Sequence, residues 1–235
     1  MMRQITAFGD SIMRGIVLDP ATDTTAPRYT LLDESFSTRC SETLGITVRN
    51  HGRFGNTTRH GLRVLERRRD QIATSDFCVM EFGGNDCDYR WQEIADHPEG
   101  DHAPASTLSL FAAQYHDMIA YVRRLGSQPV LLSLPPILSD RYFEAITRGM
   151  DALRRNNILQ WLGGSIERIA QWHEMYNLRL FKLAAMVDVP IIDITSPFLV
   201  ARNPHTFFCD DGIHPNAAGH QLIAETICRA ASEHI

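Results

Sequence analysis

Short runs of apolar residues recur along the chain, and each is closed by glycine, proline, asparagine or aspartate. Their length and their content of Val, Ile, Leu and Phe are typical of buried β-strands. The pattern predicts five strands, at Ile5–Phe8, Thr47–Asn50, Phe77–Phe82, Val130–Leu134 and Ile191–Ile194.

Longer segments with apolar residues at helical spacing lie between these runs. They predict helices at Phe36–Leu44, Thr58–Ala73, Leu108–Leu125, Ile166–Val187 and Ala217–Ser232. Apolar strands that alternate with helices are typical of a parallel sheet covered on both faces. We therefore expect an α/β fold: a three-layer α/β/α sandwich with a flavodoxin-like, five-stranded parallel sheet in the strand order 2-1-3-4-5.

Two segments interrupt this alternation. Residues 88–106 are polar and contain prolines, whereas residues 135–165 open with a double proline and carry several aromatic side chains. Long segments that follow the carboxyl ends of strands commonly form the walls of a binding site. The 235 residues suit one α/β domain, so we expect a single domain spanning residues 1–235.

Composition narrows the class of protein. The formal net charge of −5 disfavours a nucleic-acid partner. The five cysteines include no C-x-x-C pair, which disfavours a disulfide framework and a zinc ribbon. No apolar stretch approaches the ~18 residues of a membrane span, so membrane insertion is not expected. The amino terminus shows no secretion signal, and we expect a cytoplasmic protein.

Small and polar residues follow several of the predicted strands. In an open parallel sheet, ligands bind beyond the carboxyl ends of the strands, so these residues should meet at one edge. The segments are Gly9-Asp10-Ser11 after the first strand, residues 51–58 after the second, residues 83–86 after the third and residues 210–216 beyond the fifth.

Ser11 is the candidate nucleophile among these residues. A serine hydroxyl attacks a carbonyl only when a base accepts its proton, and the base needs a third group to fix its tautomer. His214 suits the base, and Asp211, three residues before it in a turn that contains Gly212, can accept from its Nδ1–H. This arrangement would leave Nε2 of His214 free for Ser11.

The oxyanion formed by such an attack needs fixed hydrogen-bond donors. The candidates are the backbone N–H of Ser11, the backbone N–H of Gly55 and the side-chain amide of Asn85. Gly55 suits a close approach of the backbone because glycine has no Cβ atom.

These motifs together resemble the four sequence blocks of the SGNH (GDSL-like) hydrolase family. G-D-S at the first strand, the glycine of the second block, G-x-N-D and a late D-x-x-H occur in that order over nearly the whole chain. The resemblance implies a bacterial lipase/acylhydrolase-like member in which Ser11 is the nucleophile, Gly55 and Asn85 donate to the oxyanion, His214 is the base and Asp211 orients it. It also implies that carboxylic esters or thioesters are cleaved without a metal or cofactor.

Several neighbouring residues allow a second interpretation. Asp10 and Asp86 are expected to stabilise turns rather than to act in catalysis. Asp210 competes with Asp211, but only Asp211 gives the D-x-x-H spacing. Cys87 follows the third block closely and is expected to be a buried structural thiol, since no cationic partner or helix amino terminus is evident for it.

Other candidate groups come from histidine and the aromatic residues. His173-Glu174 begins a zinc-protease motif, but Asn177 stands where the second histidine is required, which excludes that motif. Trp172 is expected in the core. Trp91 and Tyr142 lie on the two long segments, where a core position and a substrate contact are equally plausible, and we carry both as candidate substrate-binding residues.

The sequence thus predicts a cofactor-free serine esterase or acylhydrolase. Its small-molecule substrate is expected to be a short acyl ester, with an acetyl group on a carbohydrate as the first choice. An acyltransferase that uses the same triad is the alternative, as is a lysophospholipase- or thioesterase-type lipid acylhydrolase. The sequence leaves room for a homo-oligomer and does not specify one.

Overall fold

A five-stranded parallel sheet forms the centre of the computed structural model, which describes residues 3–19 and 27–234. Its strands are β1 (Gln4–Gly9), β4 (Thr47–Asn50), β5 (Phe77–Glu81), β6 (Gln128–Leu132) and β7 (Ile191–Ile192). The strand order is β4-β1-β5-β6-β7, with every neighbouring pair parallel. This is the predicted order 2-1-3-4-5, so the predicted fold is confirmed.

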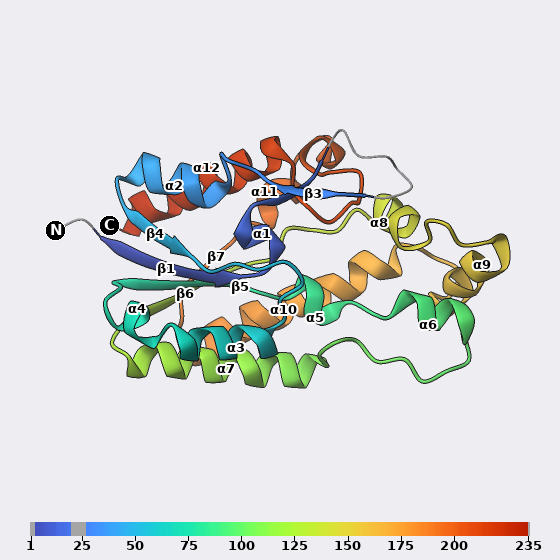
Figure 1. Cartoon of the computed structure of the whole chain (residues 1–235), viewed down its shortest axis with the longest axis horizontal. Coiled ribbons are helices and arrows are strands. Elements are labelled where there is room, and N and C mark those ends of the chain that lie inside the picture. Colours follow the sequence, from blue (N-terminus) through green and yellow to red (C-terminus); the bar gives the residue numbers. More distant parts are fainter. Residues whose placement is uncertain (1–2, 20–26, 235) are drawn as a thin grey trace.

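Helices cover both faces of the sheet (Figure 1). One face carries α2 (Phe36–Leu44), α11 (Ser196–Leu199) and α12 (Ala217–His234); the other carries α3 (Thr58–Arg67), α4 (Arg69–Ala73), α7 (Leu108–Arg124) and α10 (Arg168–Val187). Successive side chains of a strand point to opposite faces, so Ala7 of β1 packs with Ile223 of α12 while Phe8 packs with Leu65 of α3. Two apolar clusters therefore hold the three layers together.

Three local features differ from the predicted elements. The predicted helix at 58–73 is divided, because Arg68 leaves helical geometry at φ −110° and ψ 16°. β7 ends early, since the Asp193 carboxylate accepts from the N–H of Thr195 and of Ser196 and turns the chain. An antiparallel hairpin of β2 (Ile16–Leu18) and β3 (Tyr29–Leu31) was not predicted.

The two long segments fold into short helices beyond the carboxyl ends of the strands (Figure 1). The short helix α5 (Gly84–Cys87) precedes the first segment, and the 3-10 helix η1 (Pro204–Phe207) follows later in the chain. The helices of the two segments are α6 (Trp91–Asp96), α8 (Ser139–Ile146) and α9 (Ala152–Trp161). Trp91, Ile94, Phe143 and Ile158 join them in a third apolar cluster. As predicted, these segments build a wall at the edge where the polar motifs meet.

Tyr115 of α7 fixes the end of β5, immediately before the third polar motif. Its buried hydroxyl accepts from the N–H of Phe82 at 2.8 Å and donates to the carbonyl of Phe82 at 3.1 Å. Tyr115→Phe leaves both backbone groups unsatisfied, so we expect the free energy of unfolding to fall by about 1–3 kcal/mol in urea denaturation. Tyr121→Phe is the matched control on the same helix, because its hydroxyl makes no hydrogen bond within the described residues. Equal stability of the two variants would contradict this.

Candidate active site

Ser11 begins the short helix α1 (Ser11–Arg14), directly after β1. Asp10 caps this helix, because its Oδ1 accepts from the N–H of Ile12 at 2.8 Å. The helix ends after one turn at Gly15, whose φ of 83° suits glycine. The sharp change from strand to helix places the Ser11 side chain, 7% exposed, at the carboxyl edge of the sheet.

Hydrogen bonds join Ser11, His214 and Asp211 in series. Nε2 of His214 lies 2.9 Å from Oγ of Ser11, and Nδ1 of His214 lies 2.7 Å from Oδ2 of Asp211. The other oxygen of Asp211 accepts from the N–H of His214 at 3.1 Å, which closes the turn. Gly212 in this turn has a φ of 75°, and a Cβ atom there would lie 2.7 Å from the carbonyl oxygen of Leu138. The D-x-x-H spacing thus produces the expected contact.

The ionisation of Asp211 favours one tautomer of His214. Burial raises the pKa of the Asp211 carboxyl, but hydrogen bonds from the His214 ring and from backbone N–H groups outweigh burial, and the pKa lies below its usual value. The carboxylate therefore carries a negative charge at neutral pH and stabilises a proton on Nδ1. Nε2 is left to accept from the Ser11 hydroxyl.

Two aromatic rings cover His214, and sequence reasoning missed both. The ring centroid of Tyr29 lies 5.1 Å from that of His214, and the centroid of Phe54 lies 5.9 Å from it. Burial and the neighbouring Asp211 carboxylate raise the pKa of Tyr29 to about 12, so its hydroxyl stays protonated. The rings lie on β3 and on the loop after β4, so only the folded chain brings them to the histidine.

The candidate oxyanion donors occupy different surroundings. Asn85 lies in α5, and its Nδ2 donates to Oδ2 of Asp10 at 3.2 Å, which orients the amide beside Ser11. Gly55 has a φ of 71°, and a Cβ atom there would meet no atom within 4 Å. The crowded glycine is Gly52 instead, where a Cβ would lie 2.6 Å from the backbone nitrogen of Arg14. The left-handed backbone, and not crowding, explains the glycine at position 55.

A second carboxyl group, Glu81, lies beneath this site. It ends β5 opposite Gly9 and is fully buried. Burial and the adjacent Asp10 raise the pKa of Glu81 well above its usual value. Burial likewise raises the pKa of Asp10 to about 6, although its hydrogen bond from Ile12 opposes the shift. Burial therefore makes this pair bind a proton more tightly in the folded protein, and no sequence motif singled out Glu81.

The contacts of the other acidic residues and of the thiol near the site fit a structural role. The carboxylate of Asp86 accepts from the N–H of Thr58 at 3.0 Å and from its hydroxyl at 2.6 Å, so it joins the third motif to the start of α3. Cys87 is buried, and burial together with neighbouring carboxylates raises the pKa of its thiol well above the usual value. Asp210 is not in the hydrogen-bonded series. The expected structural roles of Asp86 and Cys87 fit these contacts.

A cavity of about 440 Å³ extends from Ser11 and His214 to the wall of short helices. Trp91 and Tyr142 line it, and both donate to Oδ1 of Asp88, at 2.8 Å and 2.7 Å. Trp172 was expected in the core; it packs against the core with one side and lines the same cavity. Its place at the start of a long helix gave no signal for the cavity.

The described residues hold neither a candidate metal cluster nor a candidate membrane span. Within residues 3–19 and 27–234, the His, Cys, Asp and Glu side chains form no group of three or more that is arranged to hold a metal ion. Among the same residues, no helix combines the length and the apolar character needed to cross a bilayer.

A serine, a histidine and an aspartate in series at the carboxyl edge of a parallel sheet define the arrangement of a serine hydrolase. The chain belongs to the GDSL-like lipase/acylhydrolase family, whose model matches residues 7–222. It is thus an ester-bond hydrolase by family, and the resemblance carried by the four motifs is confirmed. No curated protein matches the chain.

Solved structures of bacterial enzymes share the fold. A lipase/acylhydrolase from Enterococcus faecalis is 22% identical with a TM-score of 0.62, covering 99% of this chain and 97% of that one. A GDSL-like lipase from Bacteroides thetaiotaomicron is 16% identical with a TM-score of 0.62, covering 99% and 89%. An acetylxylan esterase from Geobacillus stearothermophilus, crystallised as a catalytic mutant, is 20% identical with a TM-score of 0.60, covering 97% and 93%. At these identities the likeness concerns the fold.

The buried Asp10–Glu81 pair should make stability depend on pH. A carboxyl group whose pKa is raised by folding binds its proton more tightly in the folded state, so stability falls as the pH rises through the interval between the unfolded and folded pKa values. Glu81→Gln removes one such group. We expect its melting temperature, relative to the unsubstituted protein, to increase steadily from about pH 5 to about pH 8.

Glu42→Gln, at an exposed position of α2, is the control and should show a constant offset over the same pH range. A constant offset for Glu81→Gln as well would mean that Glu81 does not bind a proton more tightly in the folded protein.

Proposed function

We propose that the protein is a serine esterase that acts through an acyl-enzyme formed on Ser11. The observation that carries this proposal is the hydrogen-bonded series from Asp211 through His214 to Ser11, with contacts of 2.7 Å and 2.9 Å. The acidic partner is ionised and buried, so the imidazole is held as a base toward the hydroxyl. Membership of an ester-hydrolysing family supports the same reaction.

Acylation follows from this geometry. Oγ of Ser11 attacks the ester carbonyl carbon while its proton moves to Nε2 of His214. The tetrahedral intermediate then expels the alcohol, whose oxygen takes the proton from Nε2. A water molecule attacks the acyl-enzyme in the second half, gives a proton to Nε2, and the acid leaves as Ser11 recovers its hydrogen. The carboxylate of Asp211 stabilises the imidazolium in both halves.

The oxyanion in this mechanism is held by the backbone N–H of Ser11, the backbone N–H of Gly55 and the amide of Asn85. The amide has two hydrogens on Nδ2, and Asp10 accepts one of them. The second is free to donate to the oxyanion, and the contact with Asp10 keeps the amide from rotating its oxygen toward the negative charge. Donors fixed before the reaction give the largest stabilisation of the transition state.

A short acyl group on a carbohydrate or small alcohol is the proposed substrate. The cavity of about 440 Å³ is larger than an acetyl group requires, so most of it is available to the remainder of the molecule. Trp91 and Tyr142 line that larger part and are proposed to contact the substrate. One structural neighbour is an acetylxylan esterase, and a carbohydrate ester is in keeping with that enzyme.

Ser11→Ala should abolish turnover while leaving the fold intact, because it removes only the attacking oxygen. We expect kcat for p-nitrophenyl acetate to fall by at least about a thousand-fold, with an unchanged melting temperature. Ser109→Ala, at an exposed position, is the control and should retain full activity. A fluorophosphonate probe should label the unsubstituted protein and not Ser11→Ala. Unchanged hydrolysis by Ser11→Ala would end the proposal.

Asn85→Ala tests the oxyanion donor separately from the nucleophile. The loss of one fixed donor should lower kcat for p-nitrophenyl acetate by about a hundred- to a thousand-fold with little effect on KM. Fluorophosphonate labelling of Ser11 should slow but persist, since the serine–histidine pair remains. A loss of less than about three-fold would show that the amide does not reach the oxyanion.

A further inference from the structure

Aromatic rings from α6, α9, α10 and the segment before α6 wall the cavity, and Figure 1 shows α6 and α9 lying away from α1, which carries Ser11. The ring centroid of Tyr89 lies 4.9 Å from that of Trp161 and 6.0 Å from that of Trp172. The indole N–H of Trp172 donates to the carbonyl of Cys87 at 3.0 Å, and that of Trp91 donates to Asp88. These two indoles therefore have their polar atoms satisfied within the protein, and their exposed surface is carbon. We call the end of the cavity lined by these rings the distal chamber.

His173, which follows Trp172 on α10, has no hydrogen-bond partner among the described residues. His173 of α10 lines the cavity, and only 2% of its surface is exposed. Within the described part of the chain its ring makes no hydrogen bond, and Nδ1 lies 3.7 Å from Oε1 of Glu174. Buried polar groups are nearly always paired, so an unpaired imidazole in a cavity indicates a ligand.

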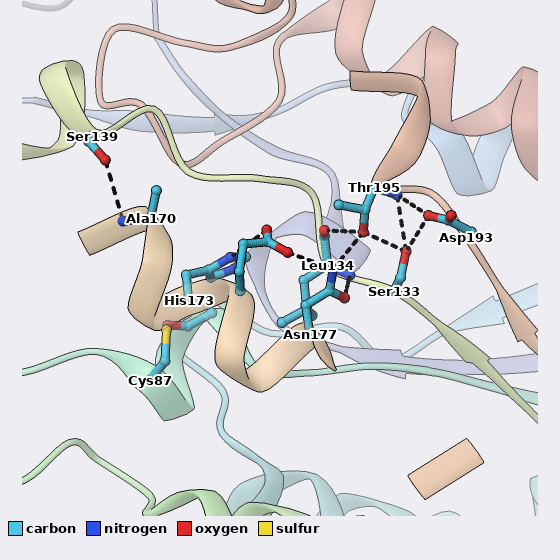
Figure 2. A network of polar contacts seen from close by, with 11 residues as sticks. Cys87, Ser133, Leu134, Ser139, Ala170, His173, Asn177, Asp193 and Thr195 are labelled. Atoms are coloured by element: carbon cyan, nitrogen blue, oxygen red, sulfur yellow. Dashed lines mark hydrogen bonds and ion pairs between the residues drawn. The ribbon is translucent and has the colours of Figure 1, made fainter. Parts of the chain in front are cut away.

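A hydrogen-bonded network around Asn177 holds Glu174 beside this imidazole. Figure 2 shows Asn177 with Leu134 and Thr195, two of its partners. Asn177 donates to Oε2 of Glu174 at 3.2 Å and to Oγ1 of Thr195 at 3.0 Å, and its own oxygen accepts from the N–H of Leu134 at 3.0 Å. Each polar atom of the Asn177 amide is therefore used. The network runs from the ends of β6 and β7 to His173, and it fixes the carboxylate on a rigid part of the fold.

The fixed carboxylate selects which nitrogen of His173 meets the ligand. Burial raises the pKa of Glu174, but His173 and Asn177 outweigh burial and hold that pKa below its usual value. A carboxylate next to Nδ1 favours the proton on that nitrogen. Nδ1 is sealed from solvent, so Nε2 is the ring nitrogen left to face the cavity, where it can accept a hydrogen bond from a ligand.

We propose that the distal chamber is a subsite for a hydroxylated ring, a sugar residue of an O-acetylated carbohydrate, with His173 accepting a hydrogen bond from one of its hydroxyls. This inference rests on the esterase function proposed above. Aromatic faces stack on the carbon surface of a sugar, and the imidazole satisfies a hydroxyl. A fatty acyl chain would leave Nε2 without a hydrogen-bond partner.

Matched substrates test the hydroxyl contact. The substrates are ethyl acetate, a mono-O-acetylated methyl glucoside, and the same glucoside with its free hydroxyls methylated. With the unsubstituted protein we expect methylation to lower kcat/KM by about ten-fold or more, the effect of losing one buried hydrogen bond. With His173→Ala, methylation should change kcat/KM by less than about two-fold, while ethyl acetate is hydrolysed as before.

Two further variants separate recognition from folding. His173→Gln keeps a hydrogen-bonding side chain and should restore part of the preference for the free hydroxyls. His116→Ala, an exposed histidine outside the cavity, is the control and should behave as the unsubstituted protein.

The outcomes that overturn the subsite are distinct from those that overturn the esterase. Equal losses on ethyl acetate and on the glucoside in His173→Ala would assign His173 a structural role. An unchanged effect of methylation in that variant, or a preference of the unsubstituted protein for ethyl octanoate over the acetylated glucoside, would also refute the subsite. Absence of ethyl acetate hydrolysis together with absence of fluorophosphonate labelling would instead refute the esterase.

Discussion

The contact between Oγ of Ser11 and Nε2 of His214 joins positions 203 residues apart in the sequence, and the rest of the site depends on it. The serine is fixed by the end of β1 and the one-turn helix α1, whereas the histidine is fixed by the turn that Asp211 closes. Burial of both side chains excludes water from the contact, which strengthens each electrostatic interaction in it. The same burial requires Asp211 to be satisfied on both oxygens, which the turn achieves.

Side-chain hydrogen bonds also join the polar motifs of the site to one another. Asp10, from the first motif, holds the amide of Asn85, and Asp86, from the third motif, holds Thr58 at the start of α3. Tyr115 fixes the backbone of Phe82 from the helix layer below. Asp10 therefore fixes the orientation of the Asn85 amide, and Asp86 joins the third motif to the start of α3.

The sequence predicted the parts of the site that depend on local patterns. Apolar runs predicted the strands. The rule that ligands bind beyond the carboxyl ends of parallel strands predicted that the motifs meet at one edge of the sheet. Spacing alone distinguished Asp211 from Asp210. Tyr29, Glu81 and His173 were not predicted to belong to the site, for different reasons. Tyr29 contacts His214 from a hairpin whose sequence carries no strong turn signal. Glu81 looks like any other strand residue in the sequence, and only the fold places Asp10 beside it. His173 follows a tryptophan that was expected in the core, so the sequence did not place it at the cavity.

The cavity is lined by two imidazoles that each lie beside a carboxylate, and by one thiol. His214 and His173 each have a carboxylate beside Nδ1, at 2.7 Å and 3.7 Å. The difference lies at Nε2, which meets a protein hydroxyl in one case and the cavity in the other. Cys87 borders the same space, but burial and nearby carboxylates keep its thiol protonated, and a protonated thiol is a weak nucleophile. In the proposed mechanism, His214 acts on the reacting bond and His173 binds the remainder of the substrate, because the two imidazoles face different groups.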